Sequence, residues 1–99
     1  MIEAAGVAIQ YANKILLLKR SNEGDNAGVF AFAGGKIEDG ETPEQAVIRE
    51  VREEIGYDIV SPLTGIAITN DGRVDFTTYV TVAPEAFNPI LNDEHDGFA

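Results

Sequence analysis

The segment from Gly35 to Tyr57 constrains the fold most, because it carries the start and stop signals of one helix. Thr42 can cap the N-terminus, and Gln45 stands where the partner residue of a capping box belongs. Gly56 is typical of the position just beyond a helix C-terminus. The sequence therefore predicts a helix from Pro43 to Ile55, with proline in the first turn.

This helix has an apolar face with an acidic face beside it. At about 100° per residue, one arc carries the apolar side chains of Val47, Ile48, Val51 and Ile55. Glu50, Glu53 and Glu54 share the neighbouring arc, which we expect to lie in solvent. A solvated acidic face is the ordinary interpretation, since exposed like charges cost little. The alternative is a bound divalent cation, because oxygen ligands suit Mg²⁺ or Mn²⁺.

The spacing of the whole segment resembles the Nudix box, the signature of the Nudix hydrolases. Gly35 is followed after five residues by Glu41, and after seven more by the run from Arg49 to Gly56, REVREEIG. Two positions depart from the family pattern: Tyr57, where an aliphatic residue is usual, and Ala33, where proline is frequent. The resemblance implies an α+β fold, a mixed β-sheet with the box helix packed on one face.

The resemblance also implies an activity and a site. The activity is hydrolysis of a nucleoside diphosphate linked to another group, with a nucleoside triphosphate as the default substrate and Mg²⁺ or Mn²⁺ as cofactor. Arg49 matches the orienting arginine of the family, paired with Glu41. Glu50 matches a residue that ligates metal in some members and acts as a base in others. The implied metal ligands are the Gly34 carbonyl, Glu50, Glu53 and Glu54.

Outside the box, the acidic tail offers a distal acid or ligand. Glu94 is the best candidate because the family often draws such a residue from this region, with Asp93 and Asp96 as competitors. A solvated carboxylate is the alternative interpretation of Glu94. His95, the only histidine, is interpreted as a surface or structural residue.

Three further side chains are candidates for binding substrate. Arg20 and Lys36 stand at a strand end and in the glycine turn, where phosphate oxygens can be bound, although an ordinary surface role is equally open. Tyr79 is a candidate to stack on a base. Phe76 shares that possibility, but core packing is the favoured interpretation.

The other segments are interpreted mainly as strands. Residues 3–11 and 14–19 form a hairpin, and the run KILLLK in the second strand predicts burial on both faces. A polar loop over residues 21–28 precedes VFAFA, residues 29–33, whose Phe30 and Phe32 are expected in the core. Residues 58–70 contain a strand interrupted by Pro62. The turn at residues 70–73 leads into a half-exposed antiparallel strand, residues 74–83, and an irregular tail.

Composition limits the partners. Seven Lys and Arg against seventeen Asp and Glu give a net charge of −10, which disfavours duplex nucleic acid but not a small nucleotide bound through metal ions. The chain has no cysteine, so disulfides and thiolate sites are excluded. No apolar run approaches the roughly 18 residues that a membrane span needs, and the N-terminus lacks a signal-peptide pattern. We therefore expect a cytoplasmic protein.

Residues 1–99 are expected to form a single domain, possibly shortened at the C-terminus, because family domains usually continue into a second helix that is missing here. One helix covers one face of a sheet, so we expect either a homodimer through the other face or low stability. Two alternatives to the enzyme remain open. A non-catalytic nucleotide-binding module would use the same fold, and a purely structural acidic domain would show no saturable binding of divalent cations.

Overall fold

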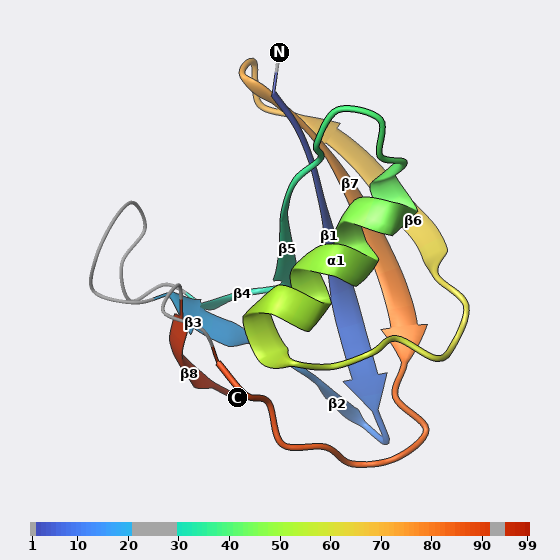
Figure 1. Cartoon of the computed structure of the whole chain (residues 1–99), viewed down its shortest axis with the longest axis vertical. Helices are drawn as coiled ribbons and strands as arrows, with labels where there is room; N and C mark the ends of the chain where they lie inside the picture. The colour runs from blue at the N-terminus through green and yellow to red at the C-terminus, as the bar shows by residue number, and fades with distance from the viewer. Residues whose placement is uncertain (1, 21–29, 92–94) are drawn as a thin grey trace.

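The computed structural model describes residues 2–20, 30–91 and 95–99. A five-stranded sheet in the order β2-β1-β7-β6, with β5 also paired to β1, lies behind the helix α1 (Pro43–Ile55) (Figure 1). Its strands are β1 (Ile2–Tyr11), β2 (Lys14–Ile15), β5 (Ala33–Lys36), β6 (Thr64–Asn70) and β7 (Val74–Val82). A three-stranded sheet holds β4 (Phe30–Ala31), β3 (Leu18–Arg20) and β8 (His95–Phe98), in the order β4-β3-β8.

The larger sheet is mixed, because β1 and β7 run parallel while its other pairs are antiparallel. One helix packs on it, and α1 is the only helix in the described residues. The expected fold class is therefore confirmed. None of the helical structure in those residues has the length and apolar character needed to cross a membrane.

Local signals determine the ends of α1 as the sequence predicts. The Thr42 hydroxyl accepts a hydrogen bond from the Gln45 backbone N–H at 3.1 Å, and the Gln45 side chain accepts from the Thr42 N–H at 2.9 Å. Gly56 ends the helix with φ 66°, a left-handed conformation that favours glycine, and its N–H donates to the Arg52 carbonyl at 3.0 Å. These bonds satisfy backbone groups that helix ends otherwise leave unpaired.

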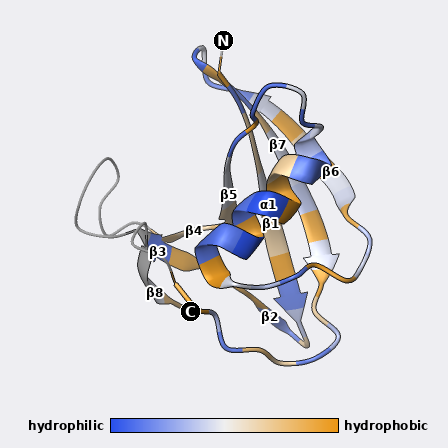
Figure 2. Ribbon diagram, in the orientation of Figure 1, coloured by the Kyte–Doolittle hydropathy of each residue, from blue (hydrophilic) through white to orange (hydrophobic). Residues whose placement is uncertain are grey.

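The core lies between α1 and the sheet. The odd-numbered residues of β1, Ala5, Val7 and Ile9, meet Val47, Val51 and Ile55 of the helix in one buried cluster. Strand alternation and the helical repeat place these side chains on facing surfaces. Figure 2 shows the outward part of α1 as mainly hydrophilic, as its acidic composition requires. Rings of Tyr57 and Phe87 stack at 4.1 Å beyond the C-terminal end of the helix.

The turn between β6 and β7 is also confirmed. The Asp71 carboxylate accepts hydrogen bonds from the backbone N–H groups of Arg73 and Val74, both at 2.9 Å, and Gly72 has φ 94°. These bonds lower the pKa of Asp71 below its ordinary value. The turn therefore joins two antiparallel strands, as its Asn-Asp-Gly sequence indicates.

Several strand predictions are wrong in detail. The run at residues 14–19 is split into β2 and β3; Ile15 is exposed and only Leu18 is fully buried, so this run is not covered on both faces. Self-association through an uncovered face of the sheet stays a prediction. Strand β7 is antiparallel only to β6, because its other edge pairs in parallel with β1. Residues 58–63 form no strand.

Phe30 and Phe32 are exposed rather than buried, since the predicted strand at residues 29–33 breaks at Phe32. In the tail, residues 84–91 are irregular as expected, but His95–Phe98 forms β8 on β3. The polar loop predicted at residues 21–28 lies outside the described residues. These predictions failed because the burial of a strand depends on which strand it pairs with, and the local sequence does not specify that partner.

Candidate active site

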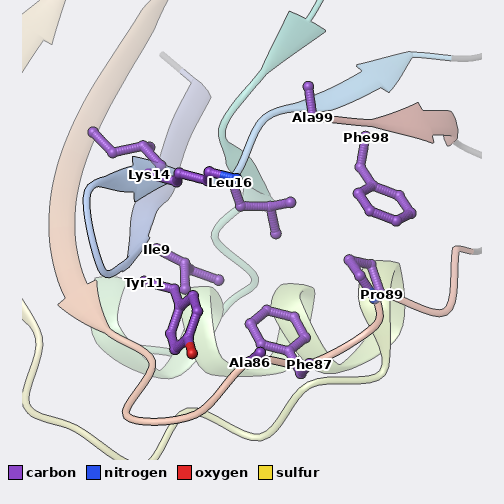
Figure 3. A pocket seen from close by; sticks show the side chains of 10 residues that line it. Ile9, Tyr11, Lys14, Leu16, Ala86, Phe87, Pro89, Phe98 and Ala99 are labelled. Atoms are coloured by element: carbon purple, nitrogen blue, oxygen red, sulfur yellow. The ribbon is translucent and has the colours of Figure 1, made fainter.

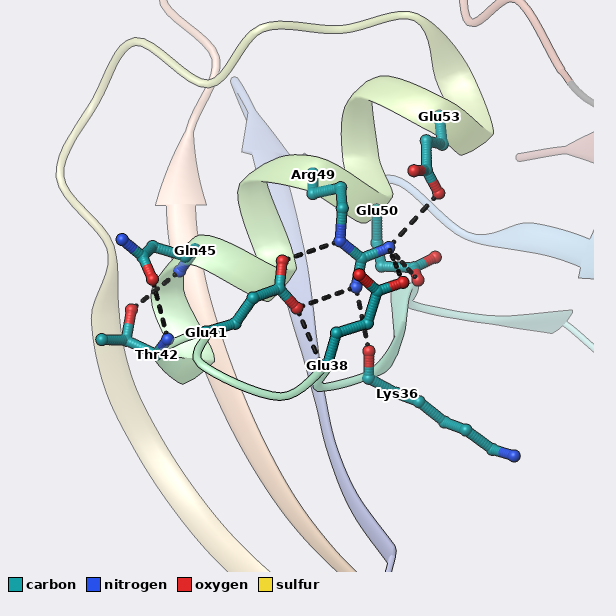
Figure 4. Close-up of polar contacts among 8 residues, drawn as sticks. All are labelled: Lys36, Glu38, Glu41, Thr42, Gln45, Arg49, Glu50 and Glu53. Atoms are coloured by element: carbon teal, nitrogen blue, oxygen red, sulfur yellow. Dashed lines mark hydrogen bonds and ion pairs between the residues drawn. The ribbon is translucent and has the colours of Figure 1, made fainter.

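Arg49 and Glu41 join the helix to the loop that precedes it. Arg49 Nε lies 2.7 Å from Glu41 Oε2, and Nη2 lies 3.0 Å from Oε1, a two-pronged contact that Figure 4 shows in full. Glu41 also accepts a hydrogen bond from the Glu38 backbone N–H at 2.9 Å. These contacts lower the pKa of Glu41, and the bond to Glu41 raises the pKa of Arg49. The expected pair is therefore present.

Arg49 reaches other groups of the same region. Its Nη1 lies 2.8 Å from Glu50 Oε1 and 3.4 Å from Glu53 Oε2, and its Nη2 donates to the Lys36 carbonyl at 3.0 Å. One guanidinium thus connects the acidic face of α1 with the end of β5 (Figure 4). An arginine fork suits this role because it offers five fixed N–H donors.

Glu54 is turned into the protein, which corrects the expectation that the whole acidic face lies in solvent. Its side chain is 2% exposed, and its Oε1 accepts a hydrogen bond from the Gly34 backbone N–H at 2.8 Å. Glu50 is 14% exposed and Glu53 55%. The three carboxylates therefore differ in environment: Glu54 borders the buried stripe of Val51 and Ile55, and Glu53 points outward.

The glycine turn of β5 admits these carboxylates because it has no side chains. A Cβ at Gly34 would lie 2.2 Å from the Ala5 carbonyl oxygen, a contact with backbone that leaves no room. A Cβ at Gly35 would lie 2.7 Å from the carboxyl carbon of Glu50. Ala33, which stands where proline is frequent, is buried in the core. Glycine is thus required at Gly34 for the close pairing of β5 with β1, and at Gly35 for the close approach of Glu50 from the helix.

The donor set suits a hard cation in its chemistry. Three carboxylates within two turns of α1, together with backbone carbonyls of the glycine turn, are the oxygen ligands that Mg²⁺ and Mn²⁺ prefer. Within residues 2–20, 30–91 and 95–99, no three acidic or histidine side chains are gathered as a ready-made site. Glu50 and Glu53 instead face Arg49, so the residues match such an ion in their chemistry but are not arranged around one.

An aromatic pocket adjoins the glycine turn. It has a volume of about 450 Å³ and is lined by Leu17, Phe30, Ala31, Phe32, Gly34, Gly35 and Phe76. Gly34 and Gly35 touch Glu54 and Glu50 respectively, so the pocket and the carboxylates share one wall. Core packing was expected for all three phenylalanines. The sequence signal for this pocket was the period-two spacing of Phe30 and Phe32, which Ala33 alone separates from the glycine pair.

Tyr79 does not have the expected role in stacking. It lies in the buried core, and its hydroxyl donates to Glu44 Oε1 at 3.0 Å. Burial, followed by the Glu44 carboxylate, raises the pKa of Tyr79. In β7 the odd-numbered side chains face α1, so Tyr79 lies on the helix side and Phe76 on the pocket side. Tyr79, expected to stack on a base, is therefore in the core, and Phe76, expected in the core, lines the pocket. The register of β7 on β1 decides to which face of the sheet each side chain points.

The remaining candidates are only partly placed. Lys36 is exposed at the end of β5, and Figure 4 shows its side chain extending away from the carboxylates around Arg49. Arg20 ends β3 opposite His95 of β8, but the side chains of Arg20, His95 and Asp96 lie outside the described part of the chain. Glu94 and Asp93 also lie outside it.

A second pocket lies beside the turn between β1 and β2. It measures about 300 Å³ and is lined by Ile9, Tyr11, Lys14, Ile15, Leu16, Ala86, Phe87, Pro89, Phe98 and Ala99 (Figure 3). Among the described residues that line it, Lys14 is the one with a charged side chain. Because none of the carboxylates of α1 reaches it, this pocket is separate from the candidate active site.

A comparison with family models decides the family. The model described as the NUDIX domain matches residues 2–98. The chain belongs to the Nudix family. Solved Nudix structures agree: the crystal structure of the MutT protein from Methanosarcina mazei Go1 superposes with a TM-score of 0.80 at 26% identity, covering 99% of this chain and 74% of that one. A MutT Nudix hydrolase from Burkholderia pseudomallei gives 0.79 at 27%, covering 99% and 80%.

Relatives with assigned activities match part of this Nudix domain. The CTP pyrophosphohydrolase of Escherichia coli (strain K12) is 47% identical over 58 residues, which are 59% of this chain and 43% of that protein. The 8-oxo-dGTP diphosphatase of Proteus vulgaris is 46% identical over 56 residues, 57% and 50% respectively. The ADP-ribose pyrophosphatase of Methanocaldococcus jannaschii is 54% identical over 48 residues, 48% and 28%. The matched parts span half or less of these relatives.

Proposed function

We propose that this Nudix domain hydrolyses the phosphoanhydride bond of a nucleoside diphosphate linked to another group. One observation carries the proposal: the glycine turn that contacts Glu50 and Glu54 also forms a wall of the aromatic pocket. A base bound in the pocket would therefore leave its phosphates beside the carboxylates. The relatives named for CTP, 8-oxo-dGTP and ADP-ribose fit that class of substrate.

We propose Glu50, Glu53, Glu54 and the Gly34 carbonyl as the ligands of the divalent cation, with Mg²⁺ or Mn²⁺ as the ion. When bound, the ion neutralises phosphate charge and polarises the bond that breaks. Glu50 and Glu53 now contact Arg49, so loading requires their carboxylates to turn from the guanidinium. Glu54 already lies against the glycine turn and needs a smaller change.

The residues of the chain have distinct roles in this proposal. Arg49, anchored on Glu41, holds the loop and orients Glu50 through its 2.8 Å contact. Glu50 is proposed to act either as a ligand of the ion or as the base that accepts a proton from the attacking water. Such preorganisation supplies much of the rate in phosphoryl transfer, where positioning and charge stabilisation dominate.

Phe32 and Phe76 are proposed to stack against the base, since base–aromatic stacking contributes about 1–3 kcal/mol per base. Lys36 and Arg20 remain proposed phosphate contacts, with Lys36 exposed and free to swing toward the substrate. Glu94 remains a proposed distal acid or ligand. The support for that role is its position in the chain, directly before His95, where β8 begins.

The test is a substrate panel of CTP, 8-oxo-dGTP and ADP-ribose with Mg²⁺ or Mn²⁺, with products identified by phosphorus NMR. Calorimetric titration of the same nucleotides and ions runs in parallel. Turnover that needs the ion supports the proposal. Saturable nucleotide binding without turnover would identify a binding module, and the absence of both binding and turnover would refute a nucleotide function.

A further inference from the structure

Strand β6 is an open edge of the larger sheet. It has β7 on one side and no other strand neighbour in the described part of the chain. All seven residues from Thr64 to Asn70 are exposed, and none is charged or proline. Edge strands in monomers usually carry charges, prolines or a covering segment, because an open row of backbone N–H and C=O groups pairs readily with another strand. Strand β6 contains no charged residue and no proline that would oppose such pairing.

Ile68 is the most exposed of the large hydrophobic residues in the described ranges, at 79%. The ladder from β6 to β7 is interrupted by an irregularity between Gly65 and Ala67, and it is regular from Ala67 to Asn70. Ile68 therefore stands within the regular part of the edge strand. A β-branched side chain there gains from a cross-strand partner on a neighbouring strand.

We propose that two copies of this chain pair through β6, antiparallel, with Ile68 of one copy opposite Ile68 of the other. A two-fold axis at Ile68 is self-complementary, as a symmetric dimer requires. It sets Ala67 opposite Thr69 and Ile66 opposite Asn70. Asp71, the first acidic residue beyond the strand, then faces Gly65 of the partner subunit. The pairing therefore places no like charges opposite each other.

The size and charge of this surface define the expected behaviour. Pairing over a short strand is smaller than the roughly 1,200 Å² of a standard interface, so the dimer is weak and depends on protein concentration. Each copy has a net charge of −10, and the two therefore repel at long range. Salt screens that repulsion over about 10 Å at 0.1 M, so added salt strengthens the association. A contact carried by ion pairs would show the opposite trend.

Sedimentation equilibrium tests the association, at concentrations from about 10 μM to about 1 mM, the range in which weak complexes form. Ile68→Lys places two cations opposite each other and is expected to lower the association constant by about tenfold or more. Val60→Lys is the matched control, because Val60 is 69% exposed but lies before β6. It adds the same charge and should retain at least the association of the wild type.

A cross-link decides the register and does not depend on the lysine variant folding. The chain has no cysteine, so Ile68→Cys has a single thiol. Residues directly opposite in an antiparallel pair have Cβ atoms about 4.5–5.5 Å apart, close to what a disulfide spans. Oxidation should convert Ile68→Cys to dimer much faster than Val60→Cys. A wild type that stays monomeric at every concentration and salt would overturn the proposal. Equal cross-linking rates, or undiminished association of folded Ile68→Lys, would do the same.

Discussion

Arg49 holds both carboxylate oxygens of Glu41, at 2.7 and 3.0 Å, across eight residues of sequence. The contact fixes the loop before α1 against the second turn of the helix, and Arg49 also reaches Glu50 at 2.8 Å. Anchoring on Glu41 therefore determines where the guanidinium stands relative to the candidate base and metal ligands. Positioning contacts of this kind are as specific as the ligands they orient.

Replacing Arg49 should impair both stability and activity. Arg49→Lys keeps the charge but loses the two-pronged contact, and we expect activity to fall by about 10–100-fold with a lower melting temperature. Calorimetric melting and steady-state kinetics measure the two effects. Arg52→Lys is the control, since the Arg52–Asp58 pair is exposed at both ends and should contribute little. A fall in activity without any change in melting would identify Arg49 as a substrate contact instead.

Glu41 should make stability depend on acid pH. Its pKa in the folded chain lies below the ordinary value of 4.5, so the unfolded chain binds more protons in that range. The stabilisation is present above pH 4.5 and is lost as the pH falls through the lowered pKa. Denaturant unfolding from neutral to acid pH should show a steeper loss for wild type than for Glu41→Gln. Parallel pH profiles would contradict this assignment.

Glu54 should combine a structural and an ionic role, which two substitutions separate. Glu54→Gln keeps an acceptor for the Gly34 N–H but removes the charge, so folding should survive while Mn²⁺ affinity and turnover fall strongly. Glu54→Ala also leaves that N–H without this partner and should cost about 1–3 kcal/mol more in unfolding free energy. Titration calorimetry and urea melts provide the readouts. Equal unfolding free energies for the two variants would show that the Gly34 contact does not stabilise the fold.

Gly34 should tolerate no side chain. In Gly34→Ala the new Cβ would lie 2.2 Å from the Ala5 carbonyl oxygen, so β1 and β5 must separate. We expect a loss of about 1–3 kcal/mol or more in unfolding free energy. Gly97→Ala is the control, because a Cβ there meets Lys19 at an ordinary 3.5 Å. Similar urea midpoints for both variants would show that the β1–β5 contact relaxes easily.

Phe32 should contribute to substrate binding more than to the chemical step. Phe32→Ala removes a ring from the pocket beside the glycine turn, and we expect KM to rise by about tenfold with kcat little changed. Phe98→Ala removes a ring of similar exposure, 48% against 40% for Phe32, from the separate pocket and should leave both constants near wild type. Equal effects of the two substitutions on KM would exclude the aromatic pocket as the base site.

The sequence by itself determined the helix and the connection that supports it. The caps at Thr42 and Gly56 act through neighbouring backbone groups, and the turn at Asp71 and Gly72 closes within four residues. The resemblance to the Nudix box implied the pairing of Arg49 with Glu41. These interactions span a few residues along the chain, so the sequence pattern contains the information needed to place them.

Tertiary structure decided everything that depends on which segments become neighbours. Parallel pairing of β7 with β1 turned Tyr79 toward the core and Phe76 toward the pocket, because a shift of one residue in register reverses every side chain. Contact with Gly34 of β5 buried Glu54, although its spacing in the helix matches that of exposed glutamates. The break at Phe32 similarly exposed two rings expected in the core. Facing and burial arise from pairing across long stretches of chain, where local propensity carries little weight.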